Sequence, residues 1–225
     1  MAELAVGLSA LNFAGAVVVN ETLQREAFKV AERSSLDAQT AKRADTLTVT
    51  AAGLMADYTW GRALGSALHT EGWDVRGAEV VMLGAGAQVA AMAQELASLG
   101  AKRLSLLAKD RPAAEQSLPA LAASTEAKAG AFTPALARPL LESADLLVRT
   151  DARLSVDRAY FGPHLNVIDL APAPLTDLRK LALSVGAKSL GLRDLQAHRM
   201  ALVLGQVLGE RLDLEPFLTA FHSGD

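Results

Sequence analysis

The segment AEVVMLGAGAQVA, at residues 78–90, holds the residue types best suited to bind a charged ligand. It combines an apolar run, a G-x-G turn and a helix-forming sequence. The glycines permit a tight turn and let a ligand approach the backbone closely. A helix that begins after such a turn directs unpaired N–H groups and the positive end of its dipole at one point, which suits a pyrophosphate. The turn therefore predicts a dinucleotide site formed by Gly84, Ala85, Gly86, Ala87, Gln88 and Val89.

The glycine pattern is incomplete, because Val89 occupies the third position of G-x-G-x-x-G. A helix with valine at this position is expected to lie slightly further from the strand than in the tightest fingerprints. The alternative interpretation is an ordinary strand, turn and helix whose glycines only let the chain reverse. A second apolar strand is predicted at Lys102–Ala108. It lies roughly 20 residues on, where a ribose-binding residue is expected, and this spacing favours the dinucleotide.

The residues after that second strand bear on which dinucleotide binds. An NAD site usually carries a carboxylate there for the ribose hydroxyls, whereas an NADP site carries cations for the 2′-phosphate. Lys109 and Arg111 flank Asp110 in this chain. We therefore expect NADP, with NAD possible. For each of these charges the alternative is a solvated loop with no role in binding.

His198 is a second candidate for chemistry, because a histidine titrates near neutral pH. On the first turn of a helix that faces a cleft, it could donate a hydrogen bond to a substrate oxygen. The alternative is a surface or half-buried histidine beside Arg199. The chain has no cysteine and only four scattered histidines, so we expect no thiolate nucleophile and no metal site.

The elements that must position these residues alternate between strands and helices. This order predicts an α/β fold with an open, doubly wound parallel sheet of the Rossmann type. The strands are expected at Val80–Leu83, Lys102–Ala108, within Ala127–Phe132, and at Asp145–Arg149, Asn166–Leu170 and Ala187–Leu190. The helices are expected at Gln88–Leu99, Thr133–Glu142, Leu175–Val185, Arg193–Gly209 and Leu214–Phe221.

The first sixty residues show a different pattern, which predicts a smaller, incomplete N-terminal α/β substrate domain. We expect a strand at Ala16–Val19, a helix at Glu21–Glu32 and a hairpin or strand pair around Leu47–Tyr58. A helix at Trp60–Glu71 would link this part to the nucleotide domain. The predicted division is therefore 1–60 for the substrate-type domain, 61–192 for the dinucleotide domain and 193–225 for C-terminal helices that pack back toward the cleft.

Composition excludes several classes of protein. A chain of 225 residues, 51% hydrophobic and 21% charged, can bury one good core and a smaller second one. The net charge of −3, without a basic stripe, argues against nucleic acid as a partner. No apolar run reaches the length of a membrane span, and no signal-peptide pattern is present, so we expect no membrane partner and a cytoplasmic location. The expected partner is a small-molecule substrate or ligand.

Five stretches of the sequence, which follow one another in the family's order, resemble motifs of the shikimate dehydrogenase family. The first, GLMADYTWGRAL, is similar to the family's G-x-x-G-x-N-T-D-x-x-G. The second is the GAGAQVA turn, and the third, DLLVRTD, is similar to the family's D-L-L-I-N-A-T. NVIDLAPAPLTDL and GLRDLQAHRMAL complete the series. The resemblance implies a substrate cleft between two domains, an NADP site to which Thr150 also contributes, and reversible hydride transfer between a ring hydroxyl and a ketone.

The sequence departs from the family where the resemblance places the catalytic pair. The family's lysine position is occupied by Leu23, which cannot act as an acid, a base or a cation unless Lys29 or another residue replaces it. Counting back from Gly61 puts Tyr58 at the position of the family's aspartate, and Asp57 matches only with a shift of one residue. Asp57 and Tyr58 are nevertheless the candidate catalytic residues.

The substrate contacts implied by the resemblance are also altered. His198 stands where the family has a glutamine, and Gln196 lies two residues earlier on another helical face. Pro172 replaces a tyrosine and has no hydroxyl to donate. Asn20 either contacts a ligand or caps the helix that follows it. Asn20, Gln196 and His198 are therefore the candidate substrate-binding residues.

The family's opening strand and helix, with a serine pair that holds the substrate carboxylate, have no match here, and Met1–Leu11 resembles a later helix of the family. A sheet edge left open in this way invites pairing, so we expect a homodimer. Two functions remain open. One is a shikimate dehydrogenase-like, NADP-dependent oxidoreductase that acts on a small polar alcohol or ketone. The other is a dinucleotide-binding protein that has lost catalysis and serves as a sensor or assembly component.

Overall fold

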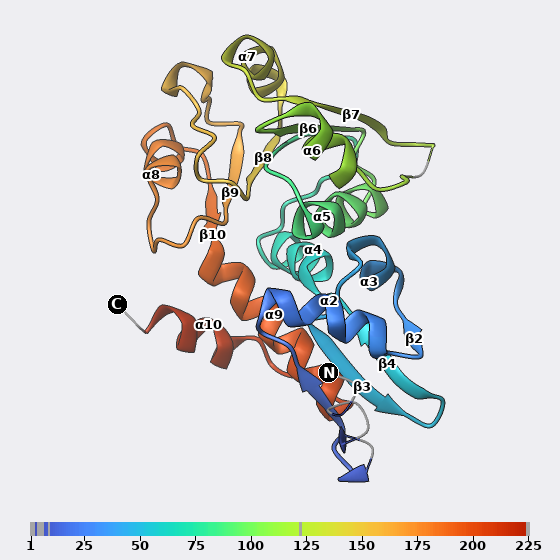
Figure 1. The fold of residues 1–225 in the computed structure, drawn as a ribbon. Helices are drawn as coiled ribbons and strands as arrows, with labels where there is room; N and C mark the ends of the chain where they lie inside the picture. Colours follow the sequence, from blue (N-terminus) through green and yellow to red (C-terminus); the bar gives the residue numbers. More distant parts are fainter. Residues whose placement is uncertain (1–2, 4–6, 9, 122, 224–225) are drawn as a thin grey trace.

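The computed structural model describes residues 3, 7–8, 10–121 and 123–223. Its larger sheet has six parallel strands in the order β10-β9-β8-β5-β6-β7 (Figure 1). This is the predicted open parallel sheet, and the order reverses between β5 and β8. The strands are β5 (Glu79–Leu83), β6 (Arg103–Ala108), β7 (Glu126–Ala131), β8 (Leu146–Arg149), β9 (Asn166–Asp169) and β10 (Ser189–Gly191).

Both faces of this sheet are buried, which is why its central strands read as continuous apolar runs. Val80 and Met82 of β5 pack in one core with α4 (Trp60–Thr70), α5 (Ala87–Ser98) and the first turn of α9 (Leu192–Leu208). Val81 and Leu83 face the opposite core, with α7 (Pro134–Ser143) and α8 (Asp177–Ser184). The predicted doubly wound architecture is therefore confirmed.

The first part of the chain forms a separate four-stranded sheet in the order β1-β3-β4-β2. The expected strand pair is the antiparallel hairpin of β3 (Thr46–Thr50) and β4 (Gly53–Asp57). β1 (Gly15–Val17) pairs antiparallel with β3, and β2 (Arg33–Ser34) pairs parallel with β4. Alternate residues of β3 and β4, with α2 (Glu21–Val30) and α3 (Leu36–Ala41), form the smaller core.

Short elements were not predicted. These are β2, α3, the helix α6 (Arg111–Ser117) and a 3-10 turn at Arg158–Tyr160. None of them is long enough to show a clear apolar period. The predicted helix at Met1–Leu11 falls largely outside the described residues. Among the described residues, no helix has the length and apolar character needed to cross a membrane.

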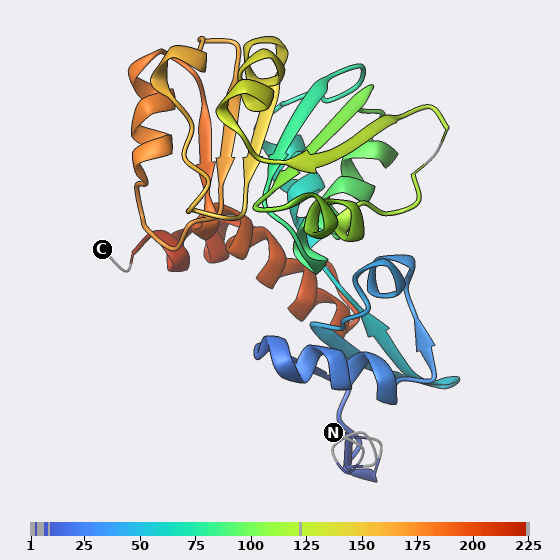
Figure 2. The same ribbon diagram turned by 45° about the horizontal axis from the view of Figure 1, so that its top comes forward.

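The long helix α9 connects the two sheets. Its first turn packs in the core of the larger sheet through Leu195, and its later turns contact β1 and β3 of the smaller sheet. Figure 2 shows α9 running below the larger sheet toward the smaller one. The last helix, α10 (Glu215–His222), lies along α9, where the His222 side chain contacts Asp194 at 2.9 Å. The domain limits at residues 60 and 192 stay a prediction.

Candidate dinucleotide and substrate site

The turn between β5 and α5 has the backbone geometry that its glycines permit. Gly84 has φ of 139° and Gly86 has φ of 101°, a region that L side chains rarely adopt. A Cβ on Gly84 would also clash with Oγ1 of Thr150, the residue that follows β8. A Cβ on Gly86 would meet no atom of the protein within 4 Å. The space beside Gly86 is therefore open to a ligand.

The first turn of α5 presents backbone donors at this open space. The first hydrogen bond of the helix runs from Ala90 N to Gly86 O at 3.0 Å. The amides of Ala87, Gln88 and Val89 therefore have no acceptor within the helix. The Val89 side chain is fully buried in the core, so only its backbone can serve a ligand. The Gly86 amide already donates to Ser117 Oγ at 2.7 Å.

A cavity of about 390 Å³ lies at the carboxyl ends of β5, β6 and β8. Its walls include Gly84, Ala85, Lys109 and Thr150, four of the residues predicted to bind the cofactor. Binding sites in open α/β sheets lie at this edge, where the strand order reverses. The cavity thus brings together residues that are far apart in the sequence.

The two predicted cations differ in position. Lys109 lines the cavity, whereas Arg111 lies outside its lining and forms an exposed ion pair with Glu115 at 2.7 Å. Asp110 accepts a hydrogen bond from Ala113 N at 2.9 Å and so caps α6. A further cation of the lining, Arg153, was not predicted, because it lies in the loop after β8 and belongs to no motif.

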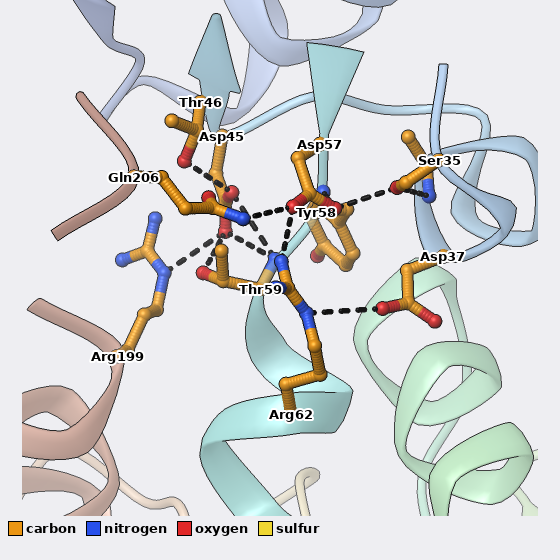
Figure 3. A network of polar contacts seen from close by, with 11 residues as sticks. Ser35, Asp37, Asp45, Thr46, Asp57, Tyr58, Thr59, Arg62, Arg199 and Gln206 are labelled. Atoms are coloured by element: carbon orange, nitrogen blue, oxygen red, sulfur yellow. Dashed lines mark hydrogen bonds and ion pairs between the residues drawn. The ribbon is translucent and has the colours of Figure 1, made fainter. Parts of the chain in front are cut away.

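In the smaller sheet, the candidate catalytic carboxylate is surrounded by donors. Asp57 accepts hydrogen bonds from Ser35 Oγ and Gln206 Nε2 and forms an ion pair with Arg62 (Figure 3). Its own neighbour donates as well, from Tyr58 N at 2.8 Å. Four donors thus surround this carboxylate, three from side chains and one from the backbone.

A second acidic residue, Asp45, was not predicted, although it is the more deeply buried one. It is 0% exposed and forms an ion pair with Arg199 of α9, N to O distance 3.0 Å. Thr59 donates to it from its backbone at 3.1 Å and from Oγ1 at 2.8 Å. The Arg199 guanidinium also lies 4.9 Å from the centre of the Trp60 ring. This pair joins α9 to the smaller sheet, as Figure 3 shows.

The remaining candidates around this sheet have structural partners. Tyr58 is buried, and burial, together with the nearby charge of Asp45, raises the pKa of its phenol above the usual value. The phenol is therefore neutral at physiological pH. Asn20 caps α2 by accepting from Thr22 N at 2.9 Å and Leu23 N at 3.3 Å. Leu23 itself is 45% exposed on α2. A ligand role for Asn20 stays a prediction.

His198 packs against α4. Its Nδ1 lies 2.9 Å from Ser66 Oγ, and it lines a cavity of about 820 Å³ between α4, α9 and residues 209–214. Neither Asn20 nor Gln196 lines this cavity. Gln196 is half-buried two residues before His198 on α9. The structure therefore does not bring the three candidate substrate residues into one cavity.

The buried position of His198 predicts a pH effect on stability. Burial lowers the pKa of His198 below its usual value, so the unfolded chain binds more protons at mildly acidic pH. We expect the free energy of unfolding to fall as pH drops below about 6.5, the usual histidine pKa. Burial raises the pKa values of Asp37 and Glu95, which acts in the opposite direction.

The variant His198→Asn isolates this effect from that of the two carboxyls. Urea unfolding of wild type and variant between pH 7.5 and about 5 measures it. The difference in stability between the two proteins should shift in favour of the variant as pH falls. A difference that is independent of pH would contradict the assignment.

A second buried ion pair lies at the carboxyl ends of β8 and β9. Arg149 donates to Asp169 from Nε at 2.9 Å and from Nη2 at 2.6 Å. The Thr176 hydroxyl donates to the same carboxylate. The pair thus fixes the segment after β9, which contains Pro172, against the end of β8. Both strands were predicted, but the pairing of their last residues was not.

Among the described residues, no group of three or more histidines, aspartates or glutamates has an arrangement that could hold a metal ion.

No protein-family model matches the chain, and no curated protein matches it either. Solved structures do match its fold. Shikimate 5-dehydrogenase from Listeria monocytogenes, solved with shikimate and NAD, is 19% identical, with a TM-score of 0.83 over 96% of this chain and 80% of that one.

Two further structures are equally similar. 5-Ketofructose reductase of Gluconobacter sp. strain CHM43 is 20% identical, with a TM-score of 0.84 over 99% of this chain and 83% of that one. Quinate dehydrogenase from Corynebacterium glutamicum, solved with NAD, is 18% identical, with a TM-score of 0.83 over 99% of this chain and 82% of that one. The chain therefore has a shikimate dehydrogenase-like fold, as the motifs indicated.

Proposed function

We propose that this chain binds a nicotinamide dinucleotide at the turn between β5 and α5. The observation that carries the proposal is the turn at the carboxyl edge of the parallel sheet: the amides of Ala87, Gln88 and Val89 have no acceptor within the helix, and a Cβ on Gly86 would meet no protein atom within 4 Å. A diphosphate is the chemical group that such an array of donors binds best. Two of the similar structures hold NAD, which supports the same class of ligand here.

Of the two cofactors, NADP is the better fit. Lys109 and Asp110 both line the cavity, but Oδ1 of Asp110 accepts a hydrogen bond from Ala113 N and caps α6, whereas the Lys109 ammonium remains a donor for a phosphate. In Lys109→Ala we expect NADPH affinity to fall about tenfold, because a charge-assisted hydrogen bond contributes about 1.5–3 kcal/mol. NADH affinity should change less than about twofold by the same reasoning. Fluorescence titration of the reduced cofactors measures both, and an equal loss for both would contradict the NADP assignment.

As a function we propose an oxidoreductase that transfers hydride between NADP and a small polar alcohol or ketone. The fold supports this proposal, since the similar structures are reductases and dehydrogenases of polar hydroxy compounds. The test follows NADPH absorbance with shikimate, quinate, their dehydro forms and 5-ketofructose. Turnover that is lost in Asp57→Asn or His198→Ala would support the proposed site.

The second candidate function is a dinucleotide-binding protein without turnover. Two observations favour it: an exposed Leu23 occupies the position of the family's lysine, and Asp57 is already held by Arg62, Ser35 and Gln206. Under this function NADPH binds, but no member of the substrate panel is turned over. Binding and turnover measured on the same preparation therefore separate the two functions.

The homodimer and the cytoplasmic location stay predictions. β1 is the outer strand of the smaller sheet, and the neighbouring Phe13 and Val19 are exposed. Exposed apolar side chains beside an open edge strand favour pairing between chains. Light scattering tests the homodimer, and a monomer at micromolar concentration would refute it.

A further inference from the structure

Arg153 lies on the opposite wall of the dinucleotide cavity from Lys109. It belongs to the loop after β8, and its side chain is 80% exposed. Lys109 follows β6, the strand on the other side of β5. The two cations therefore approach one cavity from both sides of the Gly84 turn. Arg111, which lies close to Lys109 in the sequence, lies outside the lining and is paired with Glu115.

The Arg153 guanidinium is held in a fixed orientation by Asp151. Its Nε lies 2.9 Å from Asp151 Oδ1 and its Nη2 lies 2.8 Å from Oδ2. The Arg153 backbone amide also donates to Oδ1 at 3.0 Å. This pairing uses one edge of the guanidinium. Within the described part of the chain, Nη1 has no acceptor and can donate to a ligand.

The chemistry of this arrangement fits a phosphate group. An arginine oriented by a carboxylate loses little side-chain freedom when it binds, and its planar donors match phosphate oxygens. The Arg153 side chain is exposed enough that its pair with Asp151 contributes little to stability on its own. A second cation on the other wall, Lys109, would share the same dianionic group.

We propose that Arg153 is a second specificity-determining residue for the ribose 2′-phosphate of NADP, and that Asp151 is its positioning residue. This inference rests on the proposed dinucleotide site. The residues expected to select between NAD and NADP follow β6, whereas Arg153 follows β8. The shared chemistry, a phosphate, also occurs in the cofactor's diphosphate, so the test must separate the two.

The experiment is calorimetric titration of the full chain with NADPH, NADH, 2′,5′-ADP and 5′-AMP. Arg153→Ala should weaken NADPH and 2′,5′-ADP about tenfold, the loss expected for one charge-assisted hydrogen bond. The same substitution should change the affinities for NADH and 5′-AMP by less than about twofold. Arg153→Lys should retain part of the affinity for NADPH and 2′,5′-ADP that Arg153→Ala loses. Asp151→Asn should lose part of that affinity, because Arg153 keeps its charge but is no longer held in its orientation.

Arg158→Ala is the matched control. Arg158 is an exposed arginine of the same loop that does not line the cavity, so its removal changes the net charge equally and should leave all four ligands unaffected. If Arg153→Ala weakened the binding of NADPH and NADH equally, Arg153 would contact the diphosphate, and the proposal would be overturned. Unchanged NADPH binding would overturn it too. If wild type binds neither cofactor, the proposed function fails first, and this inference with it.

Discussion

Asp45→Ala is expected to destabilise the protein by about 3–5 kcal/mol, the usual effect of removing one partner of a buried ion pair. The variant leaves the guanidinium of Arg199, a residue that is 9% exposed, without its carboxylate. It also leaves the two Thr59 donors without an acceptor. Urea unfolding at neutral pH measures the loss.

An exposed ion pair provides the control for this prediction. Arg138 and Glu142 form a pair at 2.8 Å on α7, with side chains 64% and 46% exposed. Glu142→Ala should cost less than about 1 kcal/mol. The double variant Asp45→Leu with Arg199→Leu should be more stable than Asp45→Ala alone, because no buried charge is left unpaired. A loss below about 1 kcal/mol in Asp45→Ala would show that the pair does not hold α9 on the smaller sheet.

Gly86→Ala is expected to weaken NADPH binding by at least about 100-fold, which corresponds to roughly 2.7 kcal/mol. The new methyl group meets no protein atom and projects into the space assigned to the diphosphate. The φ of 101° with ψ of −172°, a combination that essentially only glycine adopts, adds backbone strain of about 1–3 kcal/mol in the free protein. Calorimetric titration measures the affinity and urea unfolding measures the strain.

Gly77→Ala separates strain from obstruction. Gly77 also has a left-handed φ, of 73°, and a Cβ there also meets nothing within 4 Å, but it lies before β5 at the opposite edge of the sheet. We expect the same modest loss of stability and no change in NADPH affinity. Equal effects of Gly77→Ala and Gly86→Ala on affinity would mean that the open space at Gly86 does not hold the ligand.

Long periodic segments of this chain were predictable because each buries a continuous apolar face. The β5 run and the glycine turn before α5 could be placed from the sequence, as could the alternation of strands and helices along the chain. Short elements such as α3 and α6 could not, since their apolar residues are too few to set a period. Capping by Asn20 could be predicted, because an N-cap side chain and the amides that donate to it are close neighbours in the chain. The cap at Asp110 was missed together with its helix α6.

Contacts between distant residues could not be predicted in the same way. One partner of each carboxylate, Arg199 for Asp45 and Gln206 for Asp57, comes from α9, more than a hundred residues later, so no local pattern identifies it. Motif counting made His198 a candidate substrate residue, which stays a prediction, but its contact with Ser66 of α4 could not be predicted from the sequence. Arg153 belongs to no motif, and only the meeting of three strand ends in one cavity identifies it.

The most direct test of the account is the thermal unfolding midpoint of the full chain with and without NADPH. A ligand that binds only the native state at 100 times its Kd stabilises by about 2.7 kcal/mol. For a chain of 225 residues, this corresponds to a rise of about 5–10 °C. The account predicts this rise with NADPH and a smaller one with NADH at equal concentration. An unchanged midpoint with both cofactors would contradict it.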